Sequence, residues 1–482
     1  MDITRRFFAA GAGTIPLIGA GRPSAWAQSM TRDAPIIGNH AVTDPLDLAI
    51  DAYIYGYPLV TVEMTRRVLT NVTAPEGKNA PMGQFANLRE YPDAKFRAVT
   101  APNADTLYSS AFVDVGREPH ILTIPDEEWR YYLMPMLSAW TNVFAVPGKR
   151  TSGTGPQTYF IAGPGWSGSV PSGAKLIQAP TSLIWIIGRT YCTGTPEDYT
   201  AVHAAQDQYR LVPASAAGKP YTPPAGRIDP GVDMKTAVRE QVNRMDATTY
   251  FNLLASLMKD NPPALADGVP LAKMASLGIV PGQPFDPASQ PAAIREAIAR
   301  APEEAIPRIM GHLKATGSHV NGWTFTTDGG DYGKDYLQRA LVTAVGLGCN
   351  LPQDAVYPLT TVDAAGRKLN GASKYVMRFP AGELPPVDGF WSLTMYDADY
   401  FFVENQLNRY SISPRDALKA NPDGSVDLFI QTESPGAMRE TNWLPAPEGP
   451  FVLMLRTYWP KDAILNGSWS PPPVTRSASA TL

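Results

Sequence analysis

The chain has little histidine and little cysteine, and both shortages exclude kinds of site. Only five histidines occur, and none pairs in the H-x-H, H-E-x-x-H or H-x-x-x-H spacings that build local zinc or iron sites. Cys192 and Cys349 form no C-x-x-C motif, which disfavours thiol redox catalysis. Both cysteines are interpreted as small buried hydrophobic residues, although an oxidising compartment would permit a disulfide bridge between them. We therefore expect no metal site built on local spacing, and the sequence identifies no cofactor.

Other absences narrow the class of protein. The formal net charge is −4 with acids and bases interspersed, which disfavours nucleic acid as a partner. No apolar run after the N-terminal segment approaches the ~18 residues of a membrane helix. The chain has no G-x-S-x-G elbow, P-loop or dinucleotide fingerprint. Oxygen-rich runs at 328–331 and 397–399 suit calcium, but neither matches a twelve-residue loop.

The N-terminus carries the pattern of an export signal. Arg5 and Arg6 precede an apolar run from Ala9 to Ala20, and a small-x-small site ends at Ala27. The paired arginines indicate the twin-arginine route, which exports folded proteins. Residues 1–27 are therefore predicted to be a signal peptide, and the mature protein is predicted to be periplasmic or secreted.

Short strand-like runs at both ends of the chain flank a helical middle. The 47 prolines and 40 glycines fall mostly between aromatic and β-branched runs, as in strands joined by turns. We expect a mainly β protein with an α-helical insert and two β-sandwich domains. The predicted regions are an N-terminal helix plus sandwich (28–195), a connector and helical segment (196–350) and a second sandwich (351–482). A helix over 44–72 should kink or break at Pro58. Residues 129–136 are predicted to form one strand, and residues 232–245 a helix.

The sharpest local string, PNADTLYS, spans residues 102–109. It places Asn103, Asp105 and Tyr108 where a turn leads into a strand. A carboxylate and a phenol so close together in the chain could act as a general base and a general acid, if the turn reorients one of the two side chains. The competing interpretation is an Asx turn, in which an Asn or Asp side chain bonds to its own backbone.

Two further strings combine aromatic and polar residues. Trp140 and Asn142 precede the cations Lys149 and Arg150, a combination that suits an anionic or aromatic ligand. The alternative is a core tryptophan beside a solvated turn.

Near the C-terminus, Trp459 and Lys461 flank Pro460, which prevents ordinary strand continuation. Lys461 suits a general acid, an anion anchor or a plain surface charge. Arg409 belongs to a related polar-aromatic string, Asn408–Tyr410.

These strings together resemble a bacterial family. YIYGYPL at 53–59, PNADTLY at 102–108 and WTNVF at 140–144 resemble the domain of unknown function 1254. FWSLTMYD at 390–397, NRY at 408–410 and YWPK at 458–461 resemble its usual partner, the domain of unknown function 1214. The resemblance implies two β-sandwiches, the second a jelly roll, and gives weight to the string at 102–109. Ser138 departs from the acidic residue that the family pattern suggests there, so a mechanism needing a second carboxylate at that place is in doubt.

We expect an exported hydrolase-like enzyme that acts on an amide or ester of a small or polymeric organic substrate. Its site would lie in a cleft between the two β-domains. Asp105 would be the general base, and Tyr108 or Lys461 the acid or oxyanion donor. The predicted substrate-binding residues are Asn103, Trp140, Asn142, Arg409 and Trp459.

A rival hypothesis is a non-catalytic periplasmic protein that binds carbohydrate or an aromatic ligand through the same rings. A buried, paired carboxylate within a closed pocket would favour the enzyme, and a shallow exposed aromatic strip would favour binding. The sequence leaves open a homo-oligomer, the identity of the ligand and the state of the two cysteines.

Overall fold

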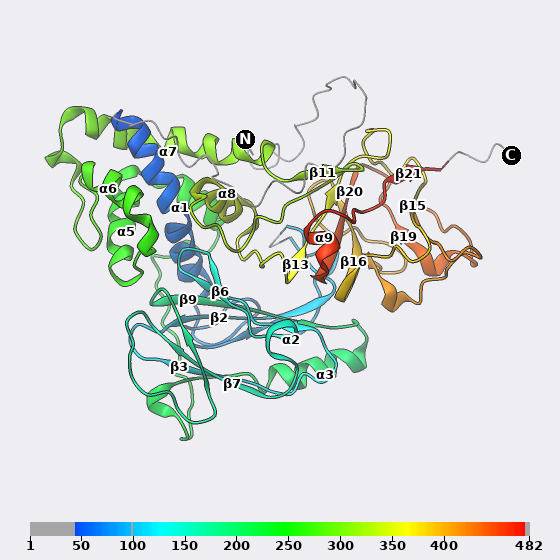
Figure 1. The fold of residues 1–482 in the computed structure, drawn as a ribbon, viewed down its shortest axis with the longest axis horizontal. Coiled ribbons are helices and arrows are strands. Elements are labelled where there is room, and N and C mark those ends of the chain that lie inside the picture. Colours follow the sequence, from blue (N-terminus) through cyan, green and yellow to red (C-terminus); the bar gives the residue numbers. More distant parts are fainter. Residues whose placement is uncertain (1–43, 98–99, 478–482) are drawn as a thin grey trace.

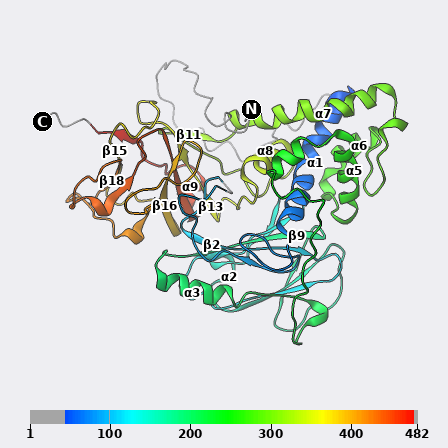
Figure 2. The same cartoon turned by 180° about the vertical axis from the view of Figure 1, so that it is seen from behind.

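The structure is a computed structural model that describes residues 44–97 and 100–477. The expected signal peptide lies outside the described residues. Two layered β regions and one helical region make up the fold, and the helical region packs above the N-terminal sheets (Figure 1). The reverse view shows the same three regions, with the C-terminal sheets beside the helices rather than behind them (Figure 2).

The N-terminal β region contains two sheets packed face to face. One has the order β1-β2-β9-β5-β6, with β4 also paired to β9. Its strands are β1 (Ala86–Asn87), β2 (Thr106–Asp114), β4 (Tyr132–Leu133), β5 (Met136–Ser138), β6 (Val143–Ala145) and β9 (Leu183–Tyr191). The other has the order β10-β3-β7-β8. It contains β3 (His120–Ile124), β7 (Gln157–Ala162), β8 (Lys175–Gln178) and β10 (Arg210–Pro213).

Residue alternation along β2 and β9 explains how this region is layered. Val113 and Ile184 face the second sheet and share a core with Leu122 and Ile161. The alternate residues, such as Phe112, face the helices instead. Both faces of this sheet are therefore buried, which explains why β9 is apolar almost throughout.

The C-terminal β region also contains two sheets. The larger has the order β11-β12-β14-β20-β16-β17, with β13 paired to β20. Its strands are β11 (Ser318–Val320), β12 (Trp323–Phe325), β13 (Ala355–Val356), β14 (Leu359–Thr360), β16 (Val387–Asp397), β17 (Ser411–Ile412) and β20 (Phe451–Pro460). The smaller, β19-β18-β15-β21, contains β15 (Tyr375–Phe379), β18 (Val426–Gln431), β19 (Trp443–Pro445) and β21 (Val474–Arg476). Alternate residues of β15, β16, β18 and β20 build the core between them.

The helical region surrounds one buried helix, α1 (Pro45–Leu69). Around it lie α4 (Val238–Asn243), α5 (Ala247–Asp260), α6 (Gly268–Ser276), α7 (Ala292–Gly311) and α8 (Tyr336–Gly346). Three short helices lie elsewhere: α2 (Lys149–Ser152), α3 (Pro196–Gln206) and α9 (Asp462–Leu465). Single 3₁₀ turns occur at Ala214–Ala216, Leu265–Asp267, Pro287–Ser289, His312–Lys314, Pro414–Asp416 and Glu440–Asn442. Within the described residues, no helix is both long and apolar enough to cross a bilayer.

Two β regions separated by helices match the fold class predicted from the sequence, and the jelly-roll topology of the second stays a prediction. Three local expectations need correction. The break considered at Pro58 does not occur, because helix α1 continues through that residue and is buried on nearly all sides. The expected strand over 129–136 is divided between β4 and β5, because Pro135 lacks a backbone N–H. A helix expected from Val232 begins only at Val238, since the Asp233 side chain accepts from Lys235 N and holds a turn there.

One carboxyl group in the N-terminal β region is buried without full pairing. Glu127 is 1% exposed, its Oε1 accepts from the Tyr209 hydroxyl and its Oε2 has no hydrogen-bond partner. Burial raises the pKa of Glu127 to about 7, although the Tyr209 hydrogen bond and the Arg130 charge oppose the rise. The folded protein therefore holds this proton more tightly than the unfolded chain, where a glutamate titrates near ~4.3.

This carboxyl group should make the protein less stable as pH rises. Between about pH 4.5 and 7 the folded state binds more protons than the unfolded state, so the free energy of unfolding falls. The loss should be on the order of 3 kcal/mol, and Glu127→Gln should remove it. Urea unfolding at several pH values measures this, with Glu128→Gln, an exposed neighbour, as the control. An unchanged pH dependence in Glu127→Gln would contradict the assignment.

Candidate functional site

A tight turn presents the string at 102–109 to the C-terminal β region. The Asn103 Oδ1 accepts from Asp105 N at 2.7 Å and from Thr106 N at 3.3 Å, so the turn is an Asx turn. The Asn103 Nδ2 donates to the Tyr458 hydroxyl on β20 at 2.8 Å. The Asn103 side chain thus stabilises the turn through its oxygen and links the two β regions through its nitrogen.

Asp105 is fully buried and paired across the same junction. Its side chain is 0% exposed, its Oδ1 lies 3.1 Å from the Arg415 guanidinium and its Oδ2 accepts from Ser392 Oγ at 2.6 Å. Arg415 also donates to the Ala104 carbonyl at 2.8 Å. Both carboxylate oxygens therefore face C-terminal groups, and the pair connects β2 to the segment that follows β17.

Tyr108 lies close to two buried arginines, Arg189 and Arg456. The Arg189 guanidinium, from the paired strand β9, is 5.0 Å from the centre of the Tyr108 ring. Burial alone would raise the pKa of the Tyr108 phenol, but the positive charges of Arg189 and Arg456 outweigh burial and hold that pKa below its ordinary value. A phenol in this setting gives up its proton more readily than a free tyrosine.

Other phenols beside Tyr108 keep their protons. Burial raises the pKa of Tyr357 to about 12 and that of Tyr458 well above its usual range. The Tyr357 hydroxyl accepts from Asn350 Nδ2 at 2.9 Å, which leaves its own proton available to a partner. Three phenols and two guanidinium groups thus converge where β2, β9 and β20 meet.

Aromatic rings line one side of this convergence. Phe390 stacks on Tyr458 with ring centres 4.3 Å apart and lies 4.4 Å from Tyr191. Trp459 stacks on Tyr131, which also contacts Phe390. Together these rings give the polar cluster an apolar wall.

An open cleft lies on the outer side of the Asp105–Arg415 pair. It encloses about 670 Å³ and is lined from both β regions. Its lining residues include Arg409 and Arg415 from the C-terminal β region, and Tyr91 and Tyr199 from the N-terminal part of the chain. Arg409 donates to the carbonyls of Glu440 and Trp443, which fixes its orientation. Arg415 therefore both lines this cleft and pairs with Asp105.

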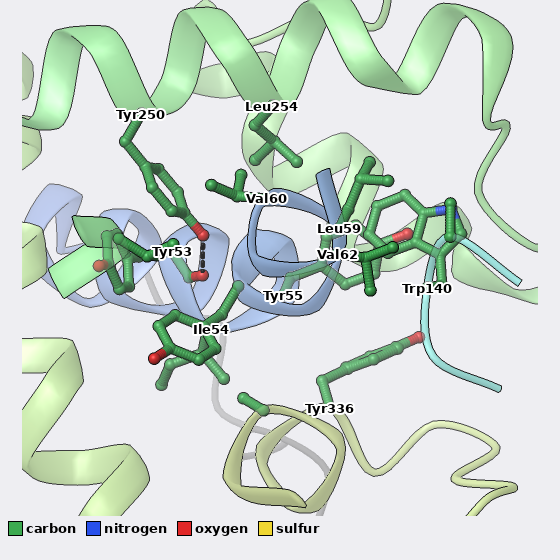
Figure 3. Packing of buried hydrophobic residues seen from close by; sticks show 14 of the residues in the cluster. Tyr53, Ile54, Tyr55, Leu59, Val60, Val62, Trp140, Tyr250, Leu254 and Tyr336 are labelled. Carbon is green, nitrogen blue, oxygen red and sulfur yellow. Dashed lines mark hydrogen bonds between the residues drawn. The ribbon is translucent and has the colours of Figure 1, made fainter. Parts of the chain in front are cut away.

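Trp140 and Asn142 lie away from the cluster. Trp140 is 4% exposed, packs against Tyr55 at 5.0 Å between ring centres and donates to the Asn261 carbonyl at 3.2 Å. It lies among helix side chains with Tyr336 (Figure 3). Asn142, two residues further on, has a buried Oδ1 without a partner. The structure does not bring either residue to Asp105.

Lys461 also lies outside the cluster. Its side chain is 53% exposed and pairs with Asp388 at 3.3 Å on the protein surface. Of the eight predicted site residues, Asn103, Asp105 and Tyr108 come together, Trp459 lies on the adjoining aromatic wall and Arg409 lines the outer cleft. Arg189 and Arg456 beside Tyr108, and Arg415 paired with Asp105, were not predicted.

No metal centre is evident in the described part of the chain, where no three His, Cys, Asp or Glu side chains gather suitably. The oxygen-rich runs at 328–331 and 397–399 contribute no such group. Both Cys192 and Cys349 are free thiols.

Comparisons with known proteins agree with this two-part construction. Residues 82–213 match the family described as protein of unknown function DUF1254, and residues 354–462 match protein of unknown function DUF1214. A crystal structure of a Vibrio parahaemolyticus protein is similar, with 26% identity and a TM-score of 0.69 over 90% of this chain and all of that one.

A structure of an uncharacterised Burkholderia cenocepacia protein is 13% identical, with a TM-score of 0.38 over 90% of this chain and 94% of that one. No curated protein matches the chain. The DUF1254 segment contains the Asn103 turn and the DUF1214 segment contains Tyr458. These two residues are hydrogen-bonded to each other across the junction of the two β regions. The chain therefore belongs to the bacterial proteins that combine a DUF1254 segment with a following DUF1214 segment.

Proposed function

We propose that the protein is an exported hydrolase-like enzyme that acts on an ester or amide of an organic substrate, with Tyr108 as its acid–base residue. The observation that carries this proposal is the Tyr108 phenol, which lies close to Arg189 and Arg456 at the junction of the two β regions. Strongly perturbed ionisable groups at such junctions are typical of active sites.

The proposed chemistry assigns one task to each phenol. Tyr108 in its phenolate form takes a proton from water, and the resulting hydroxide adds to the acyl carbon. Tyr357 keeps its proton and donates a hydrogen bond to the carbonyl oxygen as negative charge develops there. Tyr108 then returns the proton to the leaving oxygen or nitrogen, so that proton transfer balances over the cycle.

The proposal moves the base from Asp105 to Tyr108. The Asp105 side chain is 0% exposed, its Oδ2 accepts from Ser392 Oγ and its Oδ1 forms an ion pair with Arg415, so solvent water does not reach the carboxylate. We assign Asp105 a structural task, which is to hold the two β regions together beside the phenols. The paired arginines of the N-terminal segment support the exported location.

A second candidate function is ligand binding without chemistry. The observation that favours it is the outer cleft of about 670 Å³, whose lining includes tyrosines and arginines. Such a surface suits a carbohydrate or an aromatic ligand. In that case Tyr108 would be a buried structural phenol.

A substrate screen separates the two functions. The purified protein is tested with neutral aryl esters, aryl amides and glycosides. The enzyme proposal predicts turnover of an ester or amide, with a rate that rises with pH through a pKa below the ~10 of free tyrosine. Binding of a glycoside or aromatic ligand without turnover of any ester or amide would favour the second function.

A further inference from the structure

The outer cleft contains polar side chains whose hydrogen-bonding groups the protein itself leaves unused. Arg409 is one of them, and its Nη1 donates to the Glu440 carbonyl at 2.8 Å and to the Trp443 carbonyl at 2.9 Å. Its Nε and Nη2 have no hydrogen-bond partner among residues 44–97 and 100–477. Neither nitrogen is one of the buried unpaired atoms of the protein, so both are open to solvent.

Elsewhere in the protein the same edge of a guanidinium group holds two neighbouring oxygens. The Arg66 Nε and Nη2 each donate to an oxygen of Glu63 at 2.7 Å. The Arg150 Nε and Nη2 donate to the two oxygens of Asp354 at 2.7 and 2.9 Å. Two parallel N–H groups suit a pair of oxygens that lie side by side. The open edge of Arg409 therefore fits two adjacent oxygens of a ligand.

Other side chains of the cleft also lack partners. Lys95, Glu404 and Asn408 line it and are exposed, and within the described part of the chain their side chains form no hydrogen bond or ion pair. The Tyr199 hydroxyl accepts from Tyr91 N at 3.2 Å, which leaves its own proton available to a ligand. The cleft thus offers hydrogen-bond donors and acceptors together.

The charges that line the cleft balance. Three are positive and three are negative: Lys95, Arg409 and Arg415, and Asp93, Glu404 and Asp416. A balanced lining gives no net attraction to an anion or to a cation. A bare aromatic ligand would leave the charged groups that it covers without hydrogen-bond partners, which is costly. Hydroxyl groups both donate and accept, so a ligand with several adjacent hydroxyls matches this lining.

We propose that the outer cleft is a binding site for an uncharged oligosaccharide. Two neighbouring sugar oxygens accept from the Nε and Nη2 of Arg409, and sugar hydroxyls donate to Glu404. The tyrosine rings of the lining provide surfaces for the C–H faces of the sugar. This inference goes beyond the proposed hydrolase function, because it needs no chemistry at Tyr108. It also selects a carbohydrate over an aromatic ligand for the cleft.

Isothermal titration calorimetry on the full chain tests this inference with five probes. Galactotriose, cellotriose and maltotriose are the neutral probes, trigalacturonate is the anionic counterpart of galactotriose, and 4-nitrophenol is the aromatic probe. We expect at least one neutral trisaccharide to bind with a Kd below about 1 mM. Its Kd should be the same in about 0.05 M and about 0.5 M sodium chloride, because no ion pair is screened. Trigalacturonate and 4-nitrophenol should both bind more weakly.

Two variants connect the binding to the cleft. Arg409→Gln should weaken binding of the best neutral probe about 10- to 100-fold, the usual loss when hydrogen bonds to a charged group are removed. Glu404→Ala should weaken it about tenfold for the same reason. Glu404 is exposed and makes no contact that the fold needs, so this variant gives an answer even where Arg409→Gln disturbs its two carbonyl partners. Glu448→Ala, an exposed glutamate outside the cleft lining, is the matched control and should bind normally.

Absence of binding by all three neutral trisaccharides would overturn the inference. Tighter binding of trigalacturonate or 4-nitrophenol would also overturn it, as would unaltered binding in both Arg409→Gln and Glu404→Ala. Turnover of a neutral aryl ester is measured separately on the same protein. Failure to bind an oligosaccharide therefore refutes the cleft assignment alone, whereas failure to hydrolyse any ester or amide refutes the proposed function alone.

Discussion

Tyr108→Phe lowers kcat/KM on the best ester or amide substrate by about 10²- to 10⁴-fold, the usual contribution of a positioned acid–base group. The substitution removes one oxygen and keeps the ring that lies against Arg189. Loss of activity should therefore occur without loss of the fold. Steady-state kinetics measures the first effect, and thermal unfolding monitored by circular dichroism measures the second.

Tyr221→Phe is the control for this experiment, because that phenol lies in the connector segment far along the chain from the cluster. It should leave kcat/KM unchanged. Retention of activity within about threefold by Tyr108→Phe, well below the effect of a typical acid–base residue, would remove Tyr108 from the mechanism.

Asp105→Ala reduces the free energy of unfolding by about 3–5 kcal/mol, because it leaves the buried Arg415 guanidinium without its anion. It also removes the acceptor of the Ser392 hydroxyl. Chemical denaturation followed by tryptophan fluorescence gives the measurement. Asp388→Ala breaks the exposed pair with Lys461 and should cost only about 0–1 kcal/mol.

The same variant distinguishes a structural Asp105 from a catalytic one. A structural role predicts that activity falls in step with the folded fraction and returns where the variant is folded, for example at lower temperature. A catalytic role predicts a protein of unaltered stability that is inactive at every temperature. The second result would restore Asp105 as the base and displace Tyr108.

The sequence indicated the N-terminal half of the cluster because that half is local. Asn103, Asp105 and Tyr108 fall within one turn and the first residues of one strand, where a short motif is visible. The Asx-turn interpretation of Asn103 is confirmed, because its oxygen accepts from Asp105 N, and its nitrogen donates to the Tyr458 hydroxyl. Strand alternation alone puts Asp105 and Tyr108 on opposite faces. Only the tertiary structure shows that the C-terminal β region meets both.

The arginines of the cluster could not be found from spacing. Arg189 and Arg456 are single charges within apolar strands, 267 positions apart in the chain. Pairing of β2 with β9 places Arg189 opposite Tyr108, whereas Arg456 on β20 comes near Tyr108 only through the packing of the two β regions. Their one sequence signal is a charge inside a strand that is otherwise buried, which is costly unless it has a task. Trp140 was expected to bind a ligand, but it is a core residue. Its polar neighbours suggested a ligand, but the helix packing against Tyr55 buries the ring.

The central claim is that the Tyr108 phenol ionises more readily than an ordinary tyrosine. An ultraviolet difference titration of tyrosinate absorbance tests it directly, in the unaltered protein and in Tyr108→Phe. Arg189 and Arg456 favour the phenolate, burial opposes it, and the raised pKa values of Tyr357, Tyr396 and Tyr458 keep those neighbours protonated. The account predicts one tyrosine that titrates below the ~10 of free tyrosine and is missing from Tyr108→Phe. Identical titration curves for the two proteins would contradict it.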